Sequence, residues 1–194
     1  MDTSRIRLAT ADDEAAIVDA IALAFTADPI WRWAWQTPHT FLACAPEFVR
    51  VFIGAAIADG SAYCSDDLVA GCLWLRPGVH GNDAAVGELF GRSLTAAQHA
   101  DMQGIGAQME HFHPKEPHWY LPLIGVDPAH QGQGYGSALL ARTLQECDRA
   151  HMPPYLESSN VKNVPLYERY GFVTLGAIQA GSSPTMVPML RAAR

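Results

Sequence analysis

Three closely spaced glycines at the junction of an apolar segment and an amphipathic one constrain this chain more than any other feature. They lie at the end of the stretch Gly125–Gly136, which reads GVDPAHQGQGYG. The preceding residues 118–126 are typical of a strand, and residues 137–151 are typical of an amphipathic helix. Such a junction turns several unpaired backbone N–H groups toward one point, and glycine lets a ligand approach the main chain. A phosphate or pyrophosphate is the expected ligand.

The residues around the glycines exclude one class of nucleotide site and leave a second class open. No Gly-Lys-Ser or Gly-Lys-Thr follows, which excludes a P-loop. Gly132 and Gly134 match the first half of the dinucleotide fingerprint G-x-G-x-x-G, and Glu157 ends the next predicted strand, where a ribose-binding acid belongs. The third glycine, Gly136, comes one residue early, and too few strands follow to complete a doubly wound sheet. An NAD-linked oxidoreductase is therefore disfavoured but stays open.

Pro122 lies inside the predicted strand 118–126 and favours a different ligand. Because proline has no backbone N–H, it should disturb the pairing of this strand with a neighbour. Backbone groups left free at a parted strand can bond an extended, amide-bearing chain as they would bond an added strand. Pantetheine is such a chain, and the pyrophosphate attached to it would reach the glycine turn. Together these residues predict a coenzyme A site.

The rest of the chain predicts one domain, residues 1–194, of class α/β or α+β, built around one sheet. An apolar content of 49% indicates a packed core. The function of residues 77–117, which are rich in glycine, histidine and alanine, is not readable. Strands are predicted at 6–8, 61–65, 68–75, 118–126, 155–157, 172–178 and 185–190, and helices at about 12–25, 41–58, 83–90, 96–112, 137–151 and 164–170, with a tryptophan-bearing loop at 31–35.

Composition narrows the expected partners. A net charge of −7 without a run of Lys or Arg argues against a nucleic-acid partner. The longest smooth apolar stretch, Val51–Ala58, is shorter than the ~20 residues of a membrane span, and the amino terminus lacks the apolar region of a signal peptide, so no membrane partner is expected.

His111 and His113 face different ways on a predicted helix and are not expected to bind metal. Buried free thiols in a reducing cytoplasm, and no metal site, are expected for the scattered cysteines Cys44, Cys64, Cys72 and Cys147.

Two motifs in the carboxy-terminal third of the chain resemble those of the GNAT superfamily of N-acetyltransferases. Gln131-x-x-Gly134-x-Gly136 is similar to the acyl-CoA signature, and Asn160–Phe172, which reads NVKNVPLYERYGF, is similar to the second motif of the family. The resemblance implies the GNAT fold, a mixed and mostly antiparallel sheet flanked by helices. It further implies that acetyl-CoA is the co-substrate, that the acetyl group moves to the amine of a small molecule, and that a homodimer is possible.

The resemblance also implies roles for individual residues. In the family the amine attacks the acetyl thioester, a tetrahedral oxyanion forms, and the thiolate of coenzyme A leaves. Val126 is then expected to stabilise the oxyanion through its N–H, Tyr167 to protonate the leaving sulfur, and Asn160 to bond the pantetheine arm. The expected cofactor-binding residues are Ile124, Gly125, Val126, Gln131, Gly132, Gln133, Gly134, Tyr135, Gly136, Ser137, Asn160 and Tyr167.

The general base is less well specified, because Tyr120 and Pro122 occupy positions where other branches of the family carry Glu or His. Glu157 is the favoured base, because a strand interior is an unusual place for an unpaired carboxylate. It would act through a water molecule or anchor the ammonium group of the substrate. His118 is expected to share a strand face with Tyr120 and is the alternative base.

The acceptor amine is expected to lie among aromatic side chains. Trp31 and Trp33 fall where the acceptor-binding segments of the family usually lie, and Tyr120 and Glu157 complete the expected substrate-binding set. Aromatic walls suit a bulky or aromatic amine through stacking or cation–π contact. A non-catalytic acyl-CoA-binding sensor is a further alternative, which would bind acetyl-CoA and acetylate no amine.

Overall fold

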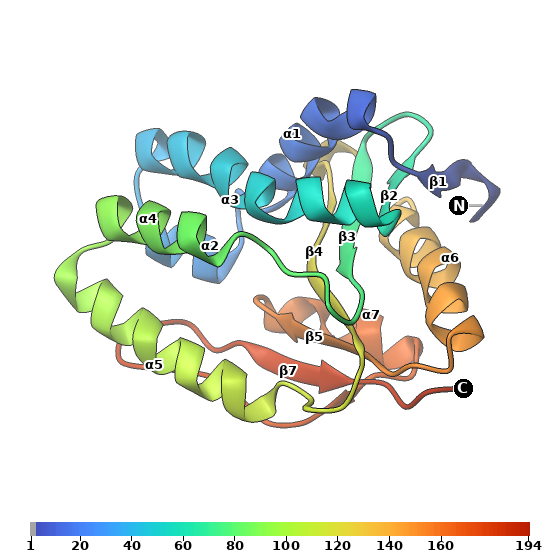
Figure 1. Cartoon of the computed structure of the whole chain (residues 1–194). Coiled ribbons are helices and arrows are strands. Elements are labelled where there is room, and N and C mark those ends of the chain that lie inside the picture. The colour runs from blue at the N-terminus through green and yellow to red at the C-terminus, as the bar shows by residue number, and fades with distance from the viewer. Residues whose placement is uncertain (1–2) are drawn as a thin grey trace.

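The computed structural model describes residues 3–194 and arranges them around a seven-stranded sheet (Figure 1). The strands are β1 (Ile6–Leu8), β2 (Ala62–Ser65), β3 (Ala70–Leu75), β4 (Trp119–Val126), β5 (Pro154–Ser158), β6 (Val173–Thr174) and β7 (Val187–Leu190). Their order in the sheet is β1-β2-β3-β4-β5-β7-β6. Neighbouring strands are antiparallel except β4 and β5, which are parallel. The predicted mixed, mostly antiparallel sheet is therefore confirmed.

Helices cover both faces of this sheet (Figure 1). They are α1 (Glu14–Ala24), α2 (Pro29–Ala34), α3 (Pro38–Asp59), α4 (Asp83–Ser93), α5 (Ala96–Phe112), α6 (Tyr135–Arg149) and α7 (Val164–Arg169). Helices α1 to α5 contribute to one hydrophobic cluster, and α6 and α7 contribute to a second cluster on the opposite face.

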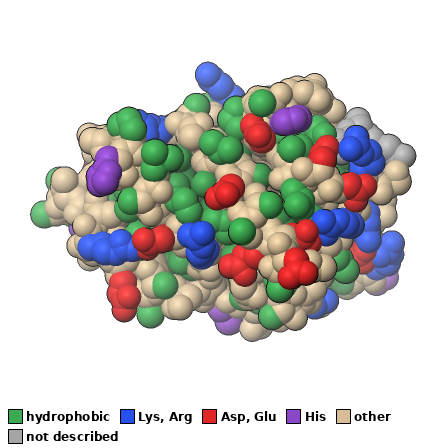
Figure 2. All heavy atoms as spheres, turned by 90° about the horizontal axis from the view of Figure 1, so that it is seen from above, with side chains coloured by type: hydrophobic (Ala, Val, Ile, Leu, Met, Phe, Trp, Pro, Cys, Tyr) green, Lys and Arg blue, Asp and Glu red, His purple; other side chains and the backbone are tan. Residues whose placement is uncertain are grey.

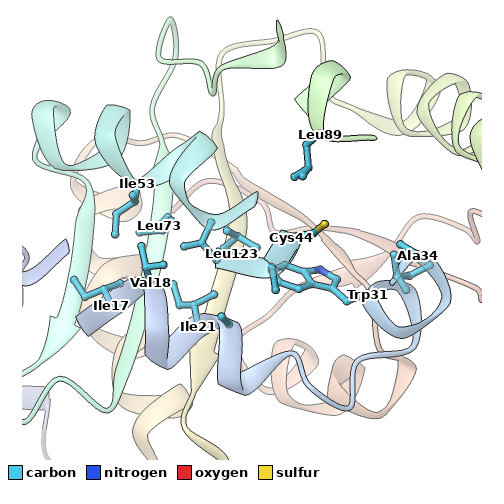
Figure 3. Close-up of a cluster of buried hydrophobic side chains, with 14 of the residues drawn as sticks. Ile17, Val18, Ile21, Trp31, Ala34, Cys44, Ile53, Leu73, Leu89 and Leu123 are labelled. Atoms are coloured by element: carbon cyan, nitrogen blue, oxygen red, sulfur yellow. The ribbon is translucent and has the colours of Figure 1, made fainter. Parts of the chain in front are cut away.

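The first cluster fixes α1 on the middle of the sheet (Figure 3). Ile17 and Ile21, one turn apart on α1, are buried together with Leu73 of β3 and Leu123 of β4. A Cβ atom at Gly71 of β3 would come within 2.9 Å of Ile17 Cγ2, so glycine lets the helix approach the strand closely. Because α1 lies directly on β3 and β4, its carboxyl end is held beside the end of β4.

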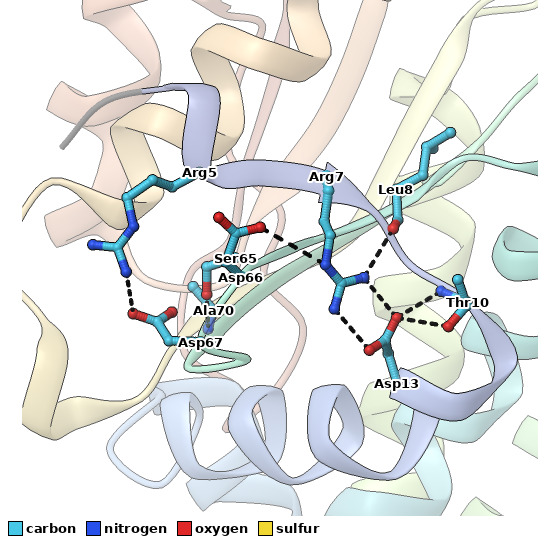
Figure 4. A network of polar contacts seen from close by, with 9 residues as sticks. All are labelled: Arg5, Arg7, Leu8, Thr10, Asp13, Ser65, Asp66, Asp67 and Ala70. Atoms are coloured by element: carbon cyan, nitrogen blue, oxygen red, sulfur yellow. Dashed lines mark hydrogen bonds and ion pairs between the residues drawn. The ribbon is translucent and has the colours of Figure 1, made fainter.

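A polar network holds the other end of α1 (Figure 4). Arg7 of β1 donates two hydrogen bonds to the carboxylate of Asp13, at 2.7 and 2.8 Å. The backbone N–H and the hydroxyl of Thr10 donate to the same carboxylate, at 2.8 Å each. These contacts lower the pKa of Asp13 well below its ordinary value, and the hydrogen bonds from Arg7 have the largest effect. The network therefore anchors the start of α1 to the edge of the sheet.

Residues 29–34 form helix α2, so the predicted loop is wrong. The carboxylate of Asp28 accepts the backbone N–H groups of Ile30 and Trp31 at 3.0 and 3.1 Å. Pro29 occupies the first helical turn, where its fixed φ is favourable. The Asp28-Pro29 pair therefore starts a helix as well as following one.

The strand predicted at 172–178 is also shorter than expected. In the described chain, Val173–Thr174 pair with β7, the N–H of Leu175 donates to the carbonyl of Pro188 at 2.9 Å, and an isolated bridge joins Ile178 to Met186. Between them, a Cβ atom at Gly176 would come within 2.6 Å of the ring of Phe112. The chain here passes against the end of α5 instead of continuing the ladder.

Helix α3 is long and apolar enough to match a membrane span by length and composition, with a mean hydropathy of 1.7. Its residues Phe41, Val49 and Ile53 are buried in the first hydrophobic cluster, as in a core helix. The side of the molecule that lies uppermost in Figure 1 carries hydrophobic side chains interspersed with charged ones (Figure 2). The expected absence of a membrane partner stays a prediction.

The four cysteines are buried and free, as predicted. Burial raises the pKa of the Cys64 thiol to about 11 and that of Cys147 to about 12. These thiols therefore stay protonated at neutral pH and act as small apolar side chains. Within residues 3–194, no group of three or more His, Cys, Asp or Glu side chains is arranged to hold a metal ion.

Candidate functional site

Strands β4 and β5 pair over a short distance and then part. Across the described chain, their parallel pairing includes only Trp119 and Tyr120 of β4. Pro122 follows at once, and the antiparallel pairing on the other side of β4 shifts register between Leu73 and Leu75. The predicted disturbance at the proline is confirmed. It leaves the remainder of β4 with an open edge toward β5.

Two residues of β4 turn their peptide groups into this opening. The N–H of Asp127 donates to the carbonyl of Val69 at 2.8 Å, which marks a hydrogen-bonded pair with the chain before β3. Because antiparallel pairs alternate, Ile124 and Val126 direct their peptide groups away from β3. The side-chain amide of Gln131 donates to the carbonyl of Val126 at 3.1 Å. The N–H of Val126 and the peptide groups of Ile124 therefore face the opening between β4 and β5.

The glycine turn ends at the amino terminus of α6. Gly132 has a φ of 74° and Gly134 a φ of 90°, values that favour glycine over any other residue. Gly134 caps α6 without a side-chain hydrogen bond, so the N–H groups of the first turn are not satisfied by a capping side chain. The glycine turn therefore has the backbone geometry expected of an anion-binding turn, and anion binding itself stays a prediction.

A first cavity, of about 490 Å³, extends from this turn along the open edge of β4. Gln133 does not line it, because its side chain lies against the carbonyl of Ala129, at 3.4 Å. Every other residue expected to bind the cofactor lines the cavity: Ile124, Gly125, Val126, Gln131, Gly132, Gly134, Tyr135, Gly136, Ser137, Asn160 and Tyr167.

Three of these residues also have structural contacts of their own. A Cβ atom at Gly125 would come within 2.8 Å of the Cβ atom of Ala24, so α1 needs a glycine there. The hydroxyl of Tyr135 donates to Asp67 at 2.6 Å, which ties the start of α6 to the turn between β2 and β3. The side chain of Asn160 accepts a backbone N–H at 3.1 Å and caps a short helical turn. The backbone rather than the side chain of Tyr135 is thus left for a ligand.

A second cavity, of about 470 Å³, lies between the sheet and helices α2 to α5 and is lined mainly by aromatic and aliphatic side chains. Among residues 3–194, Asp83 and Glu157 are the only charged residues that line it. Four residues line both cavities: Phe25, Ile124, Asn163 and Tyr167. The two cavities therefore meet beside the open edge of β4.

Tyr167 lies at this meeting point and is 6% exposed. Burial and then the nearby carboxylate of Asp28 raise the pKa of its phenol well above the ordinary value. Its hydroxyl makes no hydrogen bond to another residue in the described part of the chain. The side chain is therefore a protonated donor available at the junction of the two cavities.

Glu157 brings a buried carboxylate to the second cavity. Its side chain is 2% exposed, and its Oε1 atom has no hydrogen-bond partner within residues 3–194. The hydroxyl of Tyr155 is buried and unpaired in the same way. Burial, and then the charge of Glu157, raises the pKa of both Tyr120 and Tyr155. Since buried polar groups normally have partners, this carboxylate points to a ligand or water that donates a proton to it.

The other residues predicted to bind the acceptor or act as its base do not all line the second cavity. Trp31 and Tyr120 line the second cavity. Trp33 does not, because its indole N–H donates to Ser182 at 3.1 Å. His118 lies outside this cavity and lines a third one, of about 380 Å³. Of the two candidate bases, only Glu157 reaches the second cavity directly.

Two residues of the site were not singled out from the sequence. Asp28 is 6% exposed and lines the first cavity, and its only sequence signal was the Asp-Pro pair that precedes α2. Burial raises the pKa of Asp28, while hydrogen bonds from Ser159 and the backbone lower it. His113 follows α5, and its Nδ1 atom lies 3.8 Å from Oε1 of Glu157. No sequence pattern links this histidine to that carboxylate.

Known proteins with similar sequences include several acetyltransferases. An uncharacterized N-acetyltransferase of Schizosaccharomyces pombe is 39% identical over 71 residues, 37% of this chain and 29% of that protein. A mycothiol acetyltransferase of Mycobacterium avium is 34% identical over 108 residues, 50% of this chain and 30% of that protein. The chain thus spans less than a third of the length of these curated relatives.

Solved structures and family models match far more of the chain. A Corynebacterium glutamicum structure described as histone acetyltransferase HPA2 and related acetyltransferase covers 97% of this chain and 96% of its own, with 27% identity and a TM-score of 0.72. The model of the Acetyltransferase (GNAT) family matches residues 21–172. Since this match includes the open strand, the glycine turn and the helix that carries Tyr167, the chain belongs to the GNAT family of acetyltransferases.

Proposed function

We propose that this chain transfers the acetyl group of acetyl-CoA to the amine of a small molecule with a large apolar part. One observation carries the proposal: a cavity suited to an acyl-CoA meets an apolar cavity at Tyr167, and the apolar cavity contains the buried carboxylate of Glu157, whose Oε1 atom has no hydrogen-bond partner in the described chain. A donor and an acceptor can thus meet at one point, with a proton acceptor on one side and a proton donor on the other.

The first cavity fits acetyl-CoA, which would supply the acetyl thioester. The first-turn N–H groups of α6 and the positive-φ glycines Gly132 and Gly134 suit its pyrophosphate. The peptide groups of Ile124 and Val126 suit the amides of pantetheine. Arg169 also lines this cavity and adds positive charge near the expected phosphates.

The second cavity supports an amine with an aromatic or bulky apolar body. Trp31, Phe48 and Phe90 line it and pack edge to face or stacked with one another. Asp83 and Glu157 favour a cationic group inside this apolar space. Residues 118–140 and 155–172 look like the corresponding stretches of puromycin N-acetyltransferase, which further supports a small-molecule acceptor. The individual amine is not identified.

Each chemical step has a residue suited to it. Glu157 takes a proton from the ammonium group, directly or through water, and so frees the amine lone pair for attack. The N–H of Val126 donates to the oxyanion that forms at the open edge of β4. Tyr167 gives its proton to the leaving sulfur; its phenol is protonated at neutral pH, since burial raises its pKa.

A thermal-shift series with acetyl-CoA, coenzyme A and NAD tests the donor. A ligand at ~100 times its dissociation constant adds about 2.7 kcal/mol to the free energy of unfolding, a shift of several degrees for a domain of this size. We expect a shift with acetyl-CoA and none with NAD. A shift with NAD alone would contradict the proposal and favour the oxidoreductase, which family membership already disfavours.

A panel of amines then tests the acceptor, with release of free coenzyme A thiol as the readout. Bulky apolar amines should be acetylated faster than short polar ones. Tight binding of acetyl-CoA without acetylation of any amine would favour the non-catalytic sensor. The homodimer and the cytoplasmic location stay predictions.

A further inference from the structure

Two histidines connect the buried carboxylate of the second cavity with the third cavity. The Nδ1 atom of His113 lies 3.8 Å from Oε1 of Glu157. The Nε2 atom of His113 lies 2.9 Å from Nε2 of His118, and Nδ1 of His118 lies 2.8 Å from the carbonyl oxygen of Glu116. His113 and His118 both line the third cavity, which adjoins the apolar one at Phe52, Asp83 and Tyr120. The two rings thus form a continuous path from Glu157.

The contacts fix the direction in which this path carries a proton. A carbonyl oxygen only accepts, so Nδ1 of His118 carries the proton that bonds Glu116. Burial lowers the pKa of His118, so its ring is neutral at physiological pH and its Nε2 atom accepts. Nε2 of His113 must then donate to it. When the ring of His113 is neutral, its proton is on Nε2 and its Nδ1 atom has a lone pair that faces the carboxylate of Glu157. Nδ1 of His113 can therefore accept a proton from Glu157.

We propose that His113 and His118 relay the substrate's proton from Glu157 to solvent. The inference rests on the proposed function, since it gives that reaction an exit for the proton that the base removes. Hydrogen bonds of this kind are often long in ligand-free proteins and tighten when substrate binds, so the 3.8 Å separation suits a contact that closes during turnover. His113 and His118 act through Glu157 and are positioning residues.

The transfer balances at every step. The substrate's N–H bond breaks and the proton joins Glu157. It passes to Nδ1 of His113, whose Nε2–H bond breaks as that proton joins Nε2 of His118. His118 then releases the proton on its Nδ1 atom to water in the third cavity. The net change is one proton moved from the ammonium group to solvent, with Glu157 again a carboxylate. Both rings are again neutral but in the opposite tautomers, and proton exchange with water restores the starting tautomers before the next turnover.

The surroundings favour this path over competing ones. The rings of Tyr120 and Tyr155 contact His113, with centroids 5.1 and 4.9 Å away, and their raised pKa values keep both phenols protonated. An imidazolium at His113 lies between Glu157 and the carboxyl end of α5, where positive charge is favoured. The other charged or titratable groups around the third cavity are Arg76, His80, Asp83, Lys115 and Glu116.

Nitrogen NMR of histidine in the whole, ligand-free protein tests the connection without requiring turnover. We expect His118 to show the Nδ1–H tautomer. Glu157→Gln should change the ring-nitrogen signals of both His113 and His118 while leaving those of the exposed His111 unchanged. If neither His113 nor His118 responds to Glu157→Gln, the relay is overturned, whether or not an amine substrate has been found.

Steady-state kinetics then test whether the proton leaves Glu157 through His113 and His118 during acetyl transfer. His113→Gln and His118→Gln should each lower kcat/KM and change its pH profile, with a loss smaller than the ~100-fold or greater loss expected for Glu157→Gln. Added imidazole at constant pH should restore part of the rate. His111→Gln, at the carboxyl end of α5 and two residues before His113, is the matched control and should behave as the unmodified chain.

The outcomes separate the relay from the proposed function. If both variants keep the control's pH profile and show no rescue by imidazole while they still fold and bind acetyl-CoA by thermal shift, the relay is overturned and acetyl transfer stands. If the unmodified chain acetylates no amine, the proposed function fails and the relay has no reaction to serve. Restoration of the rate by imidazole supports the relay, because a merely structural histidine would not be replaced by a diffusing base.

Discussion

Ser159 donates a hydrogen bond of 2.6 Å to Oδ2 of Asp28, and this contact joins the end of β5 to the start of α2. The other carboxylate oxygen, Oδ1, accepts the backbone N–H groups of Ile30 and Trp31. One buried side chain therefore caps a helix and links segments 131 positions apart in the chain. Since Asp28 lines the first cavity, the same contact holds the wall of that cavity in place.

Replacement of Asp28 should separate its capping role from its charge. Asp28→Ala leaves three buried donors without their acceptor and should lower the free energy of unfolding by about 1–3 kcal/mol. Asp28→Asn keeps a good helix cap and removes the buried charge, so it should cost less. Chemical denaturation of the two variants and the unmodified chain measures both differences.

The contribution of Asp28 to the stability of the fold should change with pH in a definite direction. Burial raises the pKa of Asp28 above its unfolded value. Its contribution to stability is therefore fully present below the unfolded pKa and is lost as the pH rises through the folded pKa. Asp28→Asn, which does not titrate, should gain stability relative to the unmodified chain between mildly acidic and neutral pH. A difference that does not change over this range would contradict the assignment.

The contribution of Asp13 to stability should change with pH in the opposite direction. Its pKa is lowered, chiefly by hydrogen bonds from Arg7, so its contribution is present above the unfolded pKa and is lost as the pH falls through the folded value. Asp13→Asn should cost about 1.5–3 kcal/mol at neutral pH, the range for hydrogen bonds to charged groups. The exposed pair between Arg92 and Glu47 is the control, and Glu47→Gln should cost less than about 1 kcal/mol. Denaturation midpoints at neutral and acidic pH check both expectations.

The parts of the site that depend on local chemistry could be predicted from the sequence. Glycine at positive φ and proline within a strand act through their own backbone, so Gly132, Gly134 and Pro122 indicated the turn and the open edge without tertiary information. The order of strands and helices followed in the same way from periodicity. The expected single domain over residues 1–194 stays a prediction.

The parts that depend on tertiary contacts could not be predicted. Helix α2 was missed because Asp28-Pro29 reads equally as the stop of one helix and the start of the next. The approach of His113 to Glu157 depends on where the end of α5 meets β5, and no local pattern encodes that meeting. Trp33 was expected in the acceptor site by its position in the chain, whereas its indole turns toward Ser182.

Two glycine substitutions should have opposite effects. Gly132→Ala places a Cβ atom at a φ of 74°, which should cost about 1–2 kcal/mol and weaken acetyl-CoA binding by distorting the turn. Gly87→Ala lies within α4, where no atom lies within 4 Å of the new Cβ, and should stabilise the fold by about 0.5–1 kcal/mol. Melting temperatures with and without acetyl-CoA distinguish the two. Equal acetyl-CoA shifts in both variants would show that the turn does not bind the cofactor.

Removal of one hydroxyl tests the proposed proton donor. Tyr167→Phe keeps the buried ring and should lower kcat by about 100-fold or more, because the thiolate would leave without a proton donor. Acetyl-CoA affinity should change little, since the pyrophosphate and pantetheine sites are intact. Tyr63→Phe is the matched control, because that phenol is also buried and has a raised pKa but lines neither of the two cavities. Steady-state rates with a saturating amine, together with acetyl-CoA titrations, measure the two effects separately. A Tyr167→Phe variant as active as Tyr63→Phe would assign the proton to another donor, and Asp28, held at the first cavity by Ser159, would be the next residue to test.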